Sequence, residues 1–143
     1  MRRTGWLFRM TIVVTLIHTG NAWGGYVDNF ADWQKIDTYG RIRYAQGQFD
    51  DMTGYFSSDD QPWMTAQRIG ITSCAYKLSI TANMLSDAVT KHYQDNLGDW
   101  SLSPVVVLHT VTQRICLSYI NEERTKYGLG PWPVRTGPII GAD

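Results

Sequence analysis

Residues Cys74 to Cys116 read CAYKLSITANMLSDAVTKHYQDNLGDWSLSPVVVLHTVTQRIC and contain two helical patterns with a cysteine at either end. The first helix is expected to begin after Thr81, whose hydroxyl can accept a hydrogen bond from an unpaired amide of the first turn. Gly98 can supply a left-handed cap at its end. Apolar residues recur along this segment at helical spacing: Ala82, Leu85, Val89 and Tyr93.

The second helix is expected to open at Ser103 and Pro104, a cap residue followed by the helical position that tolerates proline. It is expected to continue to about Lys126 and to stop at Gly128. Its apolar stripe consists of Val105, Leu108, Thr112, Ile115 and Tyr119.

The short connection between these helices predicts an antiparallel hairpin. Cys116 lies about 18 Å along the second helix at the rise of an α-helix, level with the region just before the first helix, where Cys74 stands. A Cys74–Cys116 disulfide is therefore plausible, and the chain-entropy model gives it at most about 4 kcal/mol. Two unpaired buried thiols are the alternative.

The first 22 residues look like a secretory signal peptide. Arg2 and Arg3 precede a short apolar run, Met10–Ile17, and small residues end at Ala22. The run is shorter than the roughly 20 residues that span a bilayer, although an uncleaved anchor is an alternative. We expect one domain over 23–128 and an extended tail over 129–143, in the periplasm, where two cysteines favour a structural disulfide.

The charge balance excludes a basic nucleic-acid footprint. The chain has 13 Lys and Arg residues against 13 Asp and Glu residues. Removal of the signal, which holds three arginines and no acid, leaves a slightly acidic remainder.

Two further helices are expected before the hairpin. Residues 23–36 suit a short helix that packs its aromatic side chains, or a partly ordered arm. Asp37 can cap a longer helix that runs to about Ser57 and carries a buried apolar stripe. The stripe consists of Ile42, Ala45, Phe49, Met52 and Phe56.

A second seam on this longer helix is rich in glycine, which costs up to about 1 kcal/mol per residue inside a helix. Close approach by another helix or by a partner chain, including a second copy, would explain it. The seam consists of Gly40, Tyr44, Gly47, Asp51 and Gly54.

Residues Ser58–Ser73, SDDQPWMTAQRIGITS, break the helical periodicity and are expected to form a loop. An acidic pair beside a large aromatic residue suits a surface that binds a partner protein. The alternative places Trp63 in the core and leaves the acids solvated. The candidate partner-binding residues are Asp59, Asp60, Trp63 and Met64.

The sequence offers little evidence of catalysis. His92 and His109 can come level across the hairpin, but a metal site would need Asp95 or Asp99 as a third ligand, and polar positions beside a helix interface explain them more simply. The sequence lacks the usual catalytic and nucleotide-binding motifs. We therefore expect no enzyme, no metal, no cofactor and no small-molecule substrate.

The pattern resembles the Rap1a/Tai family of type VI secretion immunity proteins. The resemblance covers about Tyr39–Cys116 and begins with the helix RIRYAQGQFDD, residues 41–51, in which Arg41 replaces a family cysteine. The other matching positions are Cys74, Ile80, Thr81, Leu85, Val89, Tyr93, Trp100, Leu102, Pro104 and Cys116.

The resemblance implies a periplasmic helical protein, often dimeric, that binds and blocks a peptidoglycan-degrading amidase effector. The sequence thus predicts an all-α bundle of about four helices with a disulfide-stapled hairpin. The alternative is a structural or accessory periplasmic protein of an envelope assembly, for which Trp132 in the tail would be a docking element. Trp132 would otherwise fasten the tail to the body or leave it free.

Overall fold

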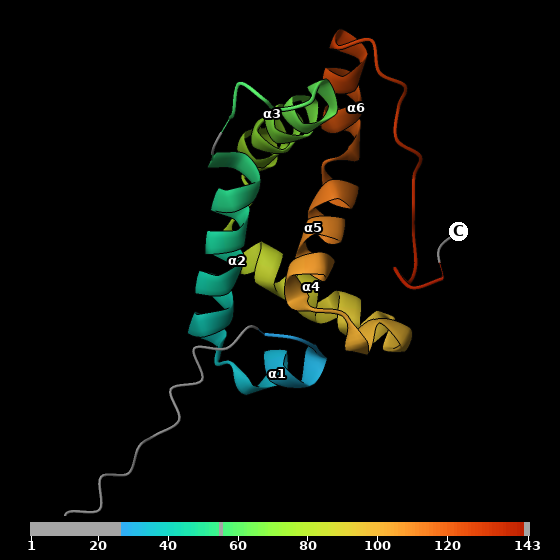
Figure 1. Ribbon diagram of the computed structural model, residues 1–143. Helices are drawn as coiled ribbons and strands as arrows, with labels where there is room; N and C mark the ends of the chain where they lie inside the picture. The colour runs from blue at the N-terminus through green and yellow to red at the C-terminus, as the bar shows by residue number, and fades with distance from the viewer. Residues whose placement is uncertain (1–26, 55, 142–143) are drawn as a thin grey trace, which may run out of the picture.

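The computed structural model describes residues 27–54 and 56–141, and the described chain is all-α with no strand. This confirms the predicted class, although six α-helices replace the expected four or so (Figure 1). The expected signal peptide, 1–22, lies outside the described residues. The elements are α1 (Phe30–Lys35), α2 (Thr38–Gly54), α3 (Pro62–Leu78), α4 (Ala82–Asp95), the 3₁₀-helix η1 (Leu97–Ser101), α5 (Pro104–Ile115) and α6 (Leu117–Lys126).

Side-chain caps fix the starts of three helices. The Thr81 hydroxyl accepts the Met84 N–H at 3.2 Å, as the sequence predicts. The Asp37 carboxylate likewise accepts the Gly40 N–H at the start of α2. Asn29 caps α1 in the same way. These caps pair amides that the first turn of a helix leaves without a partner.

The end of α4 differs from the prediction. The helix stops at Asp95 and is capped by Asn96, whose side-chain amide donates to the His92 carbonyl at 2.8 Å. Gly98 lies inside η1 instead of capping α4. The amide of Asn96 satisfies an end carbonyl, so the glycine cap is not needed.

The loop predicted over Ser58–Ser73 is wrong from Pro62 onward. Pro62 occupies the first turn of α3, where its missing N–H costs no hydrogen bond. The sequence shows no clear helical periodicity here because the buried face of α3 is narrow and made mostly of small side chains. That face consists of Ala66, Gly70, Ile71 and Cys74.

The expected continuous last helix is divided at Cys116 into α5 and α6. Ile115, expected in the buried stripe, is exposed at the end of α5, and the buried positions beyond it are Cys116 and Ile120. Gly128 stops α6 as predicted: it has a φ of 70°, and the next amide, that of Leu129, donates to the Arg124 carbonyl at 2.9 Å.

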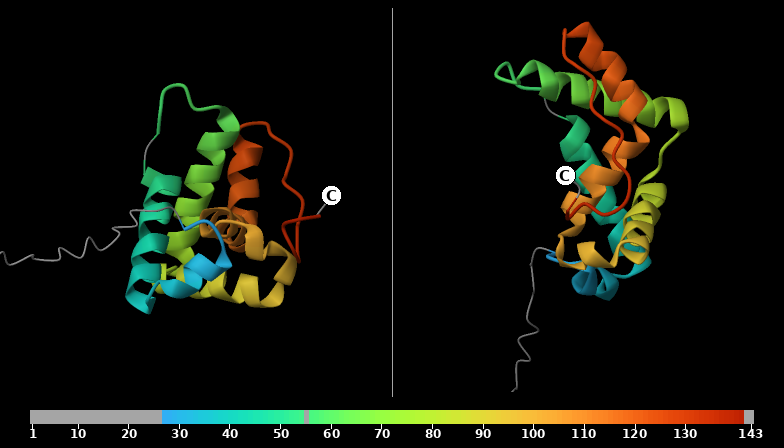
Figure 2. Two further views of the ribbon diagram at one scale, coloured as in Figure 1. Left: turned by 60° about the horizontal axis from the view of Figure 1, so that its bottom comes forward. Right: turned by 90° about the vertical axis from the view of Figure 1, so that its right-hand side faces the viewer.

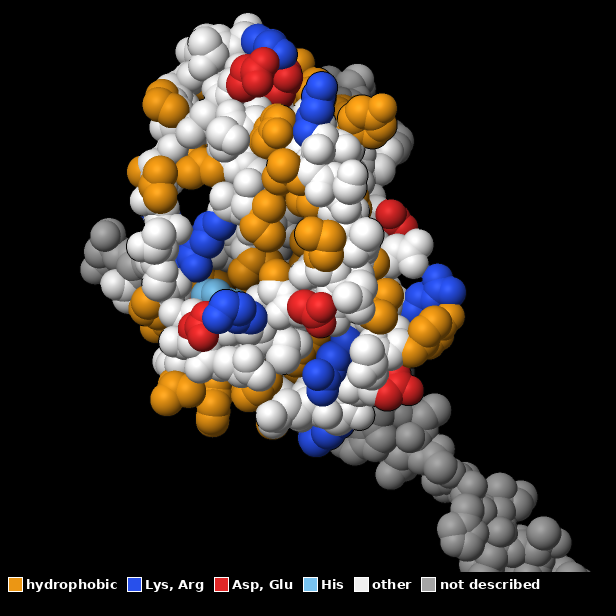
Figure 3. All heavy atoms as spheres, turned by 180° about the vertical axis from the view of Figure 1, so that it is seen from behind, with side chains coloured by type: hydrophobic (Ala, Val, Ile, Leu, Met, Phe, Trp, Pro, Cys, Tyr) orange, Lys and Arg blue, Asp and Glu red, His pale blue; other side chains and the backbone are white. Residues whose placement is uncertain are grey.

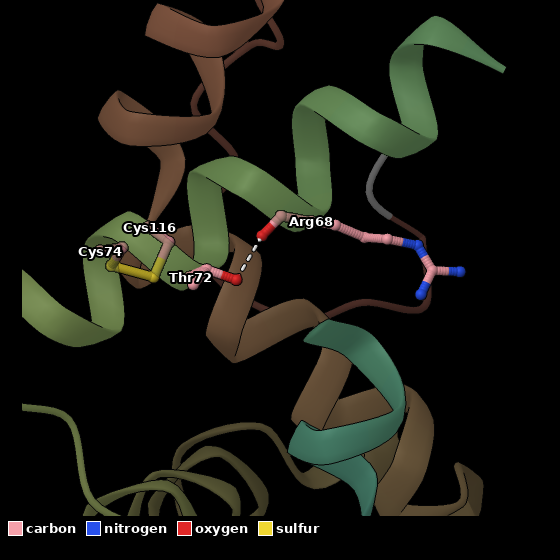
Figure 4. Close-up of a disulfide and its surroundings, with 4 residues drawn as sticks. All are labelled: Arg68, Thr72, Cys74 and Cys116. Carbon is pink, nitrogen blue, oxygen red and sulfur yellow. Dashed lines mark hydrogen bonds between the residues drawn. A yellow bond between two sulfur atoms is a disulfide. The ribbon is translucent and has the colours of Figure 1, made fainter. Parts of the chain in front are cut away.

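The Cys74–Cys116 disulfide is confirmed, with a Cα–Cα distance of 5.4 Å. It joins α3 to the junction between α5 and α6, instead of closing the base of a hairpin (Figure 4). Cys74 therefore belongs to a helix of its own and not to the approach to α4. Ile71 and Ile120 bury the bridge in a small apolar cluster that holds α3 against α6.

The larger core lies among α1, α2, α4 and α5. Trp33 is fully buried there, and its indole N–H donates to the Thr90 hydroxyl at 3.0 Å. Phe30 stacks on Tyr93 at a ring-centroid distance of 4.8 Å. The short helix α1 is therefore an integral part of the core, in agreement with the helical interpretation of residues 23–36 over its described part.

The glycine seam on α2 does not face a neighbouring helix of the described chain. A Cβ built on Gly47 or Gly54 meets no atom within 4 Å, and the closest atom to one on Gly40 belongs to Ile36 beside it. Asp51 is exposed, whereas Tyr44 packs edge-on against Trp33. Close approach by another helix is thus wrong for this seam, and approach by a partner chain stays a prediction.

Candidate binding groove

The C-terminal tail runs back along α6 and α5 (Figure 2) and is fastened to the body. The Trp132 N–H donates to the Asn121 side chain at 2.7 Å, and the Asn121 amide donates back to the Trp132 carbonyl at 3.0 Å. The Arg124 guanidinium stacks over the Trp132 ring at 4.7 Å. The tail is therefore a strap, the first of the two alternatives that the sequence leaves open.

The far end of the strap is held by Asp99, which is fully buried in η1, the turn that joins α4 to α5. Its carboxylate accepts the Ile139 and Ile140 amides at 2.6 and 2.9 Å and meets the His92 ring at 2.7 Å. Burial raises the pKa of Asp99, but the two amides and His92 together lower it further, so the net pKa lies below the ordinary value. The ionised form is the one that holds the strap.

The two histidines considered for a metal site have different surroundings and do not share a ligand position. His92 binds Asp99, whereas His109 leaves its Nε2 without a partner among the described residues, and burial lowers the pKa of His109. Over 27–54 and 56–141, no three His, Cys, Asp or Glu side chains come together as a metal-ligand set. Of the two histidines, His92 is therefore the one that supports the strap, through Asp99.

A groove of about 370 Å³ opens between α3, α5 and the strap. Trp63 stands on its wall with 46% of its surface exposed. Two glutamines and Leu117 also line it. The lining residues that carry an aromatic ring, a charge, an amide or a proline ring are Trp63, Gln67, Gln113, Arg114, Trp132, Pro133 and Arg135.

A second hollow of about 490 Å³ lies between α4, α5 and the last part of the strap. Arg114 lines both hollows and fastens the strap between them, donating to the Gly137 carbonyl at 2.9 Å. Figure 3 shows the surface hollowed beside the strap, with basic side chains next to the hollow.

The four candidate partner-binding residues separate in the structure. Trp63 and Met64 lie on the first turn of α3, and only Trp63 lines the groove. Asp59 is exposed on the preceding turn. Asp60 already forms an ion pair within the protein: its side chain is 8% exposed, and its carboxylate lies 3.5 Å from the guanidinium of Arg68.

Two groove residues, Arg114 and Arg135, have no local sequence signal. Each arginine is isolated in its own segment and reaches the site only because α5 and the tail meet beside α3. Trp132 stands out in the sequence, but as a docking element or a fastening of the tail and not as a wall of a groove.

The fold and the groove define a disulfide-bonded, all-α protein with an open hollow that is aromatic and basic. No family model, no curated protein and no solved structure matches this chain. None of the described helices is long and apolar enough to cross a membrane.

Proposed function

We propose that this chain is an exported binding protein that blocks a partner by gripping it at the Trp63 groove. The observation that carries the proposal is Trp63 itself: a large indole, half exposed, on the wall of an open hollow. Tryptophan is among the residue types most enriched at the energetic centres of protein interfaces. A site of this kind needs shape and stiffness, and no reactive group.

The rigidity of the scaffold suits such a binding site. The disulfide ties α3, which carries Trp63, to the α5–α6 junction, and the strap closes the other side. A wall that is already ordered loses little conformational entropy when a partner binds. The disulfide also fits an oxidising compartment, and with the expected signal peptide it supports the periplasm as the place of action.

We take the partner to be a peptidoglycan-degrading amidase effector, because the sequence resembles the Rap1a/Tai family. In the alternative, an accessory envelope protein docks through its tail, whose Trp132 is bonded to Asn121 and stacked with Arg124 on the body. We prefer the inhibitor because the groove adds a second large aromatic residue, the exposed Trp63, to the surface that a partner can contact.

The proposal is tested by capturing partners of the exported, oxidised chain from a periplasmic extract of its source. Wild type, Trp63→Ala and Tyr76→Ala are compared side by side; Tyr76 lies on the same helix, is 83% exposed and does not line the groove. We expect a protein that wild type and Tyr76→Ala retain, that Trp63→Ala loses, and whose hydrolysis of peptidoglycan stops when wild type is added. Retention by all three variants, or undiminished hydrolysis, would reject the proposal.

A further inference from the structure

We infer that the segment of the partner that enters the Trp63 groove is a short acidic peptide segment, with a carboxylate beside an aromatic or aliphatic side chain. The inference rests on the proposed function and specifies the chemistry of the partner. It follows from the charges, the unpaired donors and the apolar walls of the groove.

The charged side chains that line the groove have one sign. They are Arg114 and Arg135, and none of the described lining residues is acidic. The nearest acid in sequence to Trp63 is Asp60, which already faces Arg68. A basic groove on a chain with a formal net charge of zero is a local feature, so it favours a local acidic group over a nucleic acid, which needs an extended basic surface.

Arg135 also has donors to offer, whereas Arg114 contributes mainly its charge. Arg135 is exposed and forms no ion pair with any described residue. Arg114 uses its Nη1 on the Gly137 carbonyl, while its Nε is buried without an acceptor among the described residues. A carboxylate is the acceptor that fits the planar fork of a guanidinium.

The remaining walls are uncharged, and besides the hydroxyl of Thr110 they are apolar or amide. Trp63, Leu117 and Pro133 present apolar surface, and Gln67 and Gln113 add neutral donors. A hollow of about 370 Å³ holds a few side chains and not a whole domain, as in other pockets of this size. These walls therefore suit an apolar side chain next to the acid that meets the arginines.

The experiment is an unbiased peptide selection on the full oxidised chain. A displayed random peptide library is selected on wild type and counter-selected on Trp63→Ala. We expect the surviving peptides to be enriched in Asp or Glu next to an aromatic or aliphatic residue. Survivors that are neutral or basic, or no survivor that depends on Trp63, would overturn the inference.

The charge is then tested on the best selected peptide by fluorescence anisotropy. Its affinity should fall at least tenfold when its acids become Asn or Gln, and at least tenfold in Arg135→Glu. Lys77→Glu, an equal charge change on an exposed part of α3 outside the groove, should alter the affinity less than twofold. Equal effects of the two charge reversals would contradict the inference. Arg114 is left intact because it fastens the strap.

The two proposals fail separately. If the captured partner depends on Trp63 but the selected peptides are not acidic, the acidic segment is wrong and the inhibitor stands. If acidic peptides bind but no captured enzyme is inhibited, the groove is correctly described and the inhibitor is wrong.

Discussion

Among the described glycines, Gly70 is the one whose added methyl group would meet the backbone of another helix. A Cβ at Gly70 would lie 2.5 Å from the Cα of Ile120, a backbone atom that cannot move aside without shifting α6. The close approach that the sequence assigns to the α2 glycines therefore occurs on α3. A glycine inside a helix signals close packing only where the fold places another backbone against it.

We expect Gly70→Ala to lower the free energy of unfolding by about 1–3 kcal/mol, because the core there has no room. Gly47→Ala is the matched control: its Cβ meets nothing, so the lower cost of ordering alanine should raise the free energy by about 0.5–1 kcal/mol. Urea denaturation of both variants measures the two changes. Equal changes of the same sign would contradict the packing at Gly70.

Asp99 makes the strap sensitive to acid. Its pKa is lower in the folded protein than the ordinary 3.8, so it contributes stability that is present above pH 3.8 and is lost as pH falls through the folded pKa. We expect the Ile139 and Ile140 amides to be protected from hydrogen exchange at neutral pH, to keep that protection at pH 3.8, and to lose it only as the pH falls further, through the lowered pKa of the folded Asp99.

Asp99→Ala should lose the same protection at every pH. Asp95→Ala is the control, since Asp95 is exposed and pairs only with Lys91 among the described ion pairs. Protection of Ile139 that survives in Asp99→Ala would show that the carboxylate does not hold the strap.

Helix starts were the elements that the sequence predicted best. Thr81 and Asp37 begin their helices as expected because a cap is a local interaction within four residues. The helix α3 was missed because its burial depends on α6, whose residues lie about 50 positions later and offer no local periodicity. The break at Cys116 was missed for a similar reason, since the disulfide that anchors it links distant segments.

The disulfide should stabilise the pair α3 and α6 more than the rest of the molecule. It closes a loop of 42 residues, and we expect the double variant Cys74→Ala, Cys116→Ala to lose about 2–4 kcal/mol of unfolding free energy. Because the larger core lies among α1, α2, α4 and α5, amide hydrogen exchange in the double variant should exceed that of wild type mainly in α3 and α6. A uniform rise over all helices, or an unchanged unfolding midpoint, would contradict this division.

At the scale of the whole molecule, the all-α class and the cysteine pairing could be predicted, whereas the groove could not. The sequence indicates Trp63 because a tryptophan beside turn-forming residues is typical of an exposed binding position. Arg114, Trp132 and Arg135 join it only through the folding of the tail against α5, which brings together residues up to about 70 positions apart. Local sequence patterns carry no information on which distant residues will line the same groove.

The central claim is that the indole of Trp63 grips a partner from this groove. The most direct measurement is calorimetric titration of the captured partner with wild type, Trp63→Ala and Tyr76→Ala, after circular dichroism has shown all three to be folded. We predict that Trp63→Ala weakens binding by at least about 2 kcal/mol, roughly 30-fold in Kd, while Tyr76→Ala leaves it within twofold. An unchanged Kd for Trp63→Ala would contradict the claim.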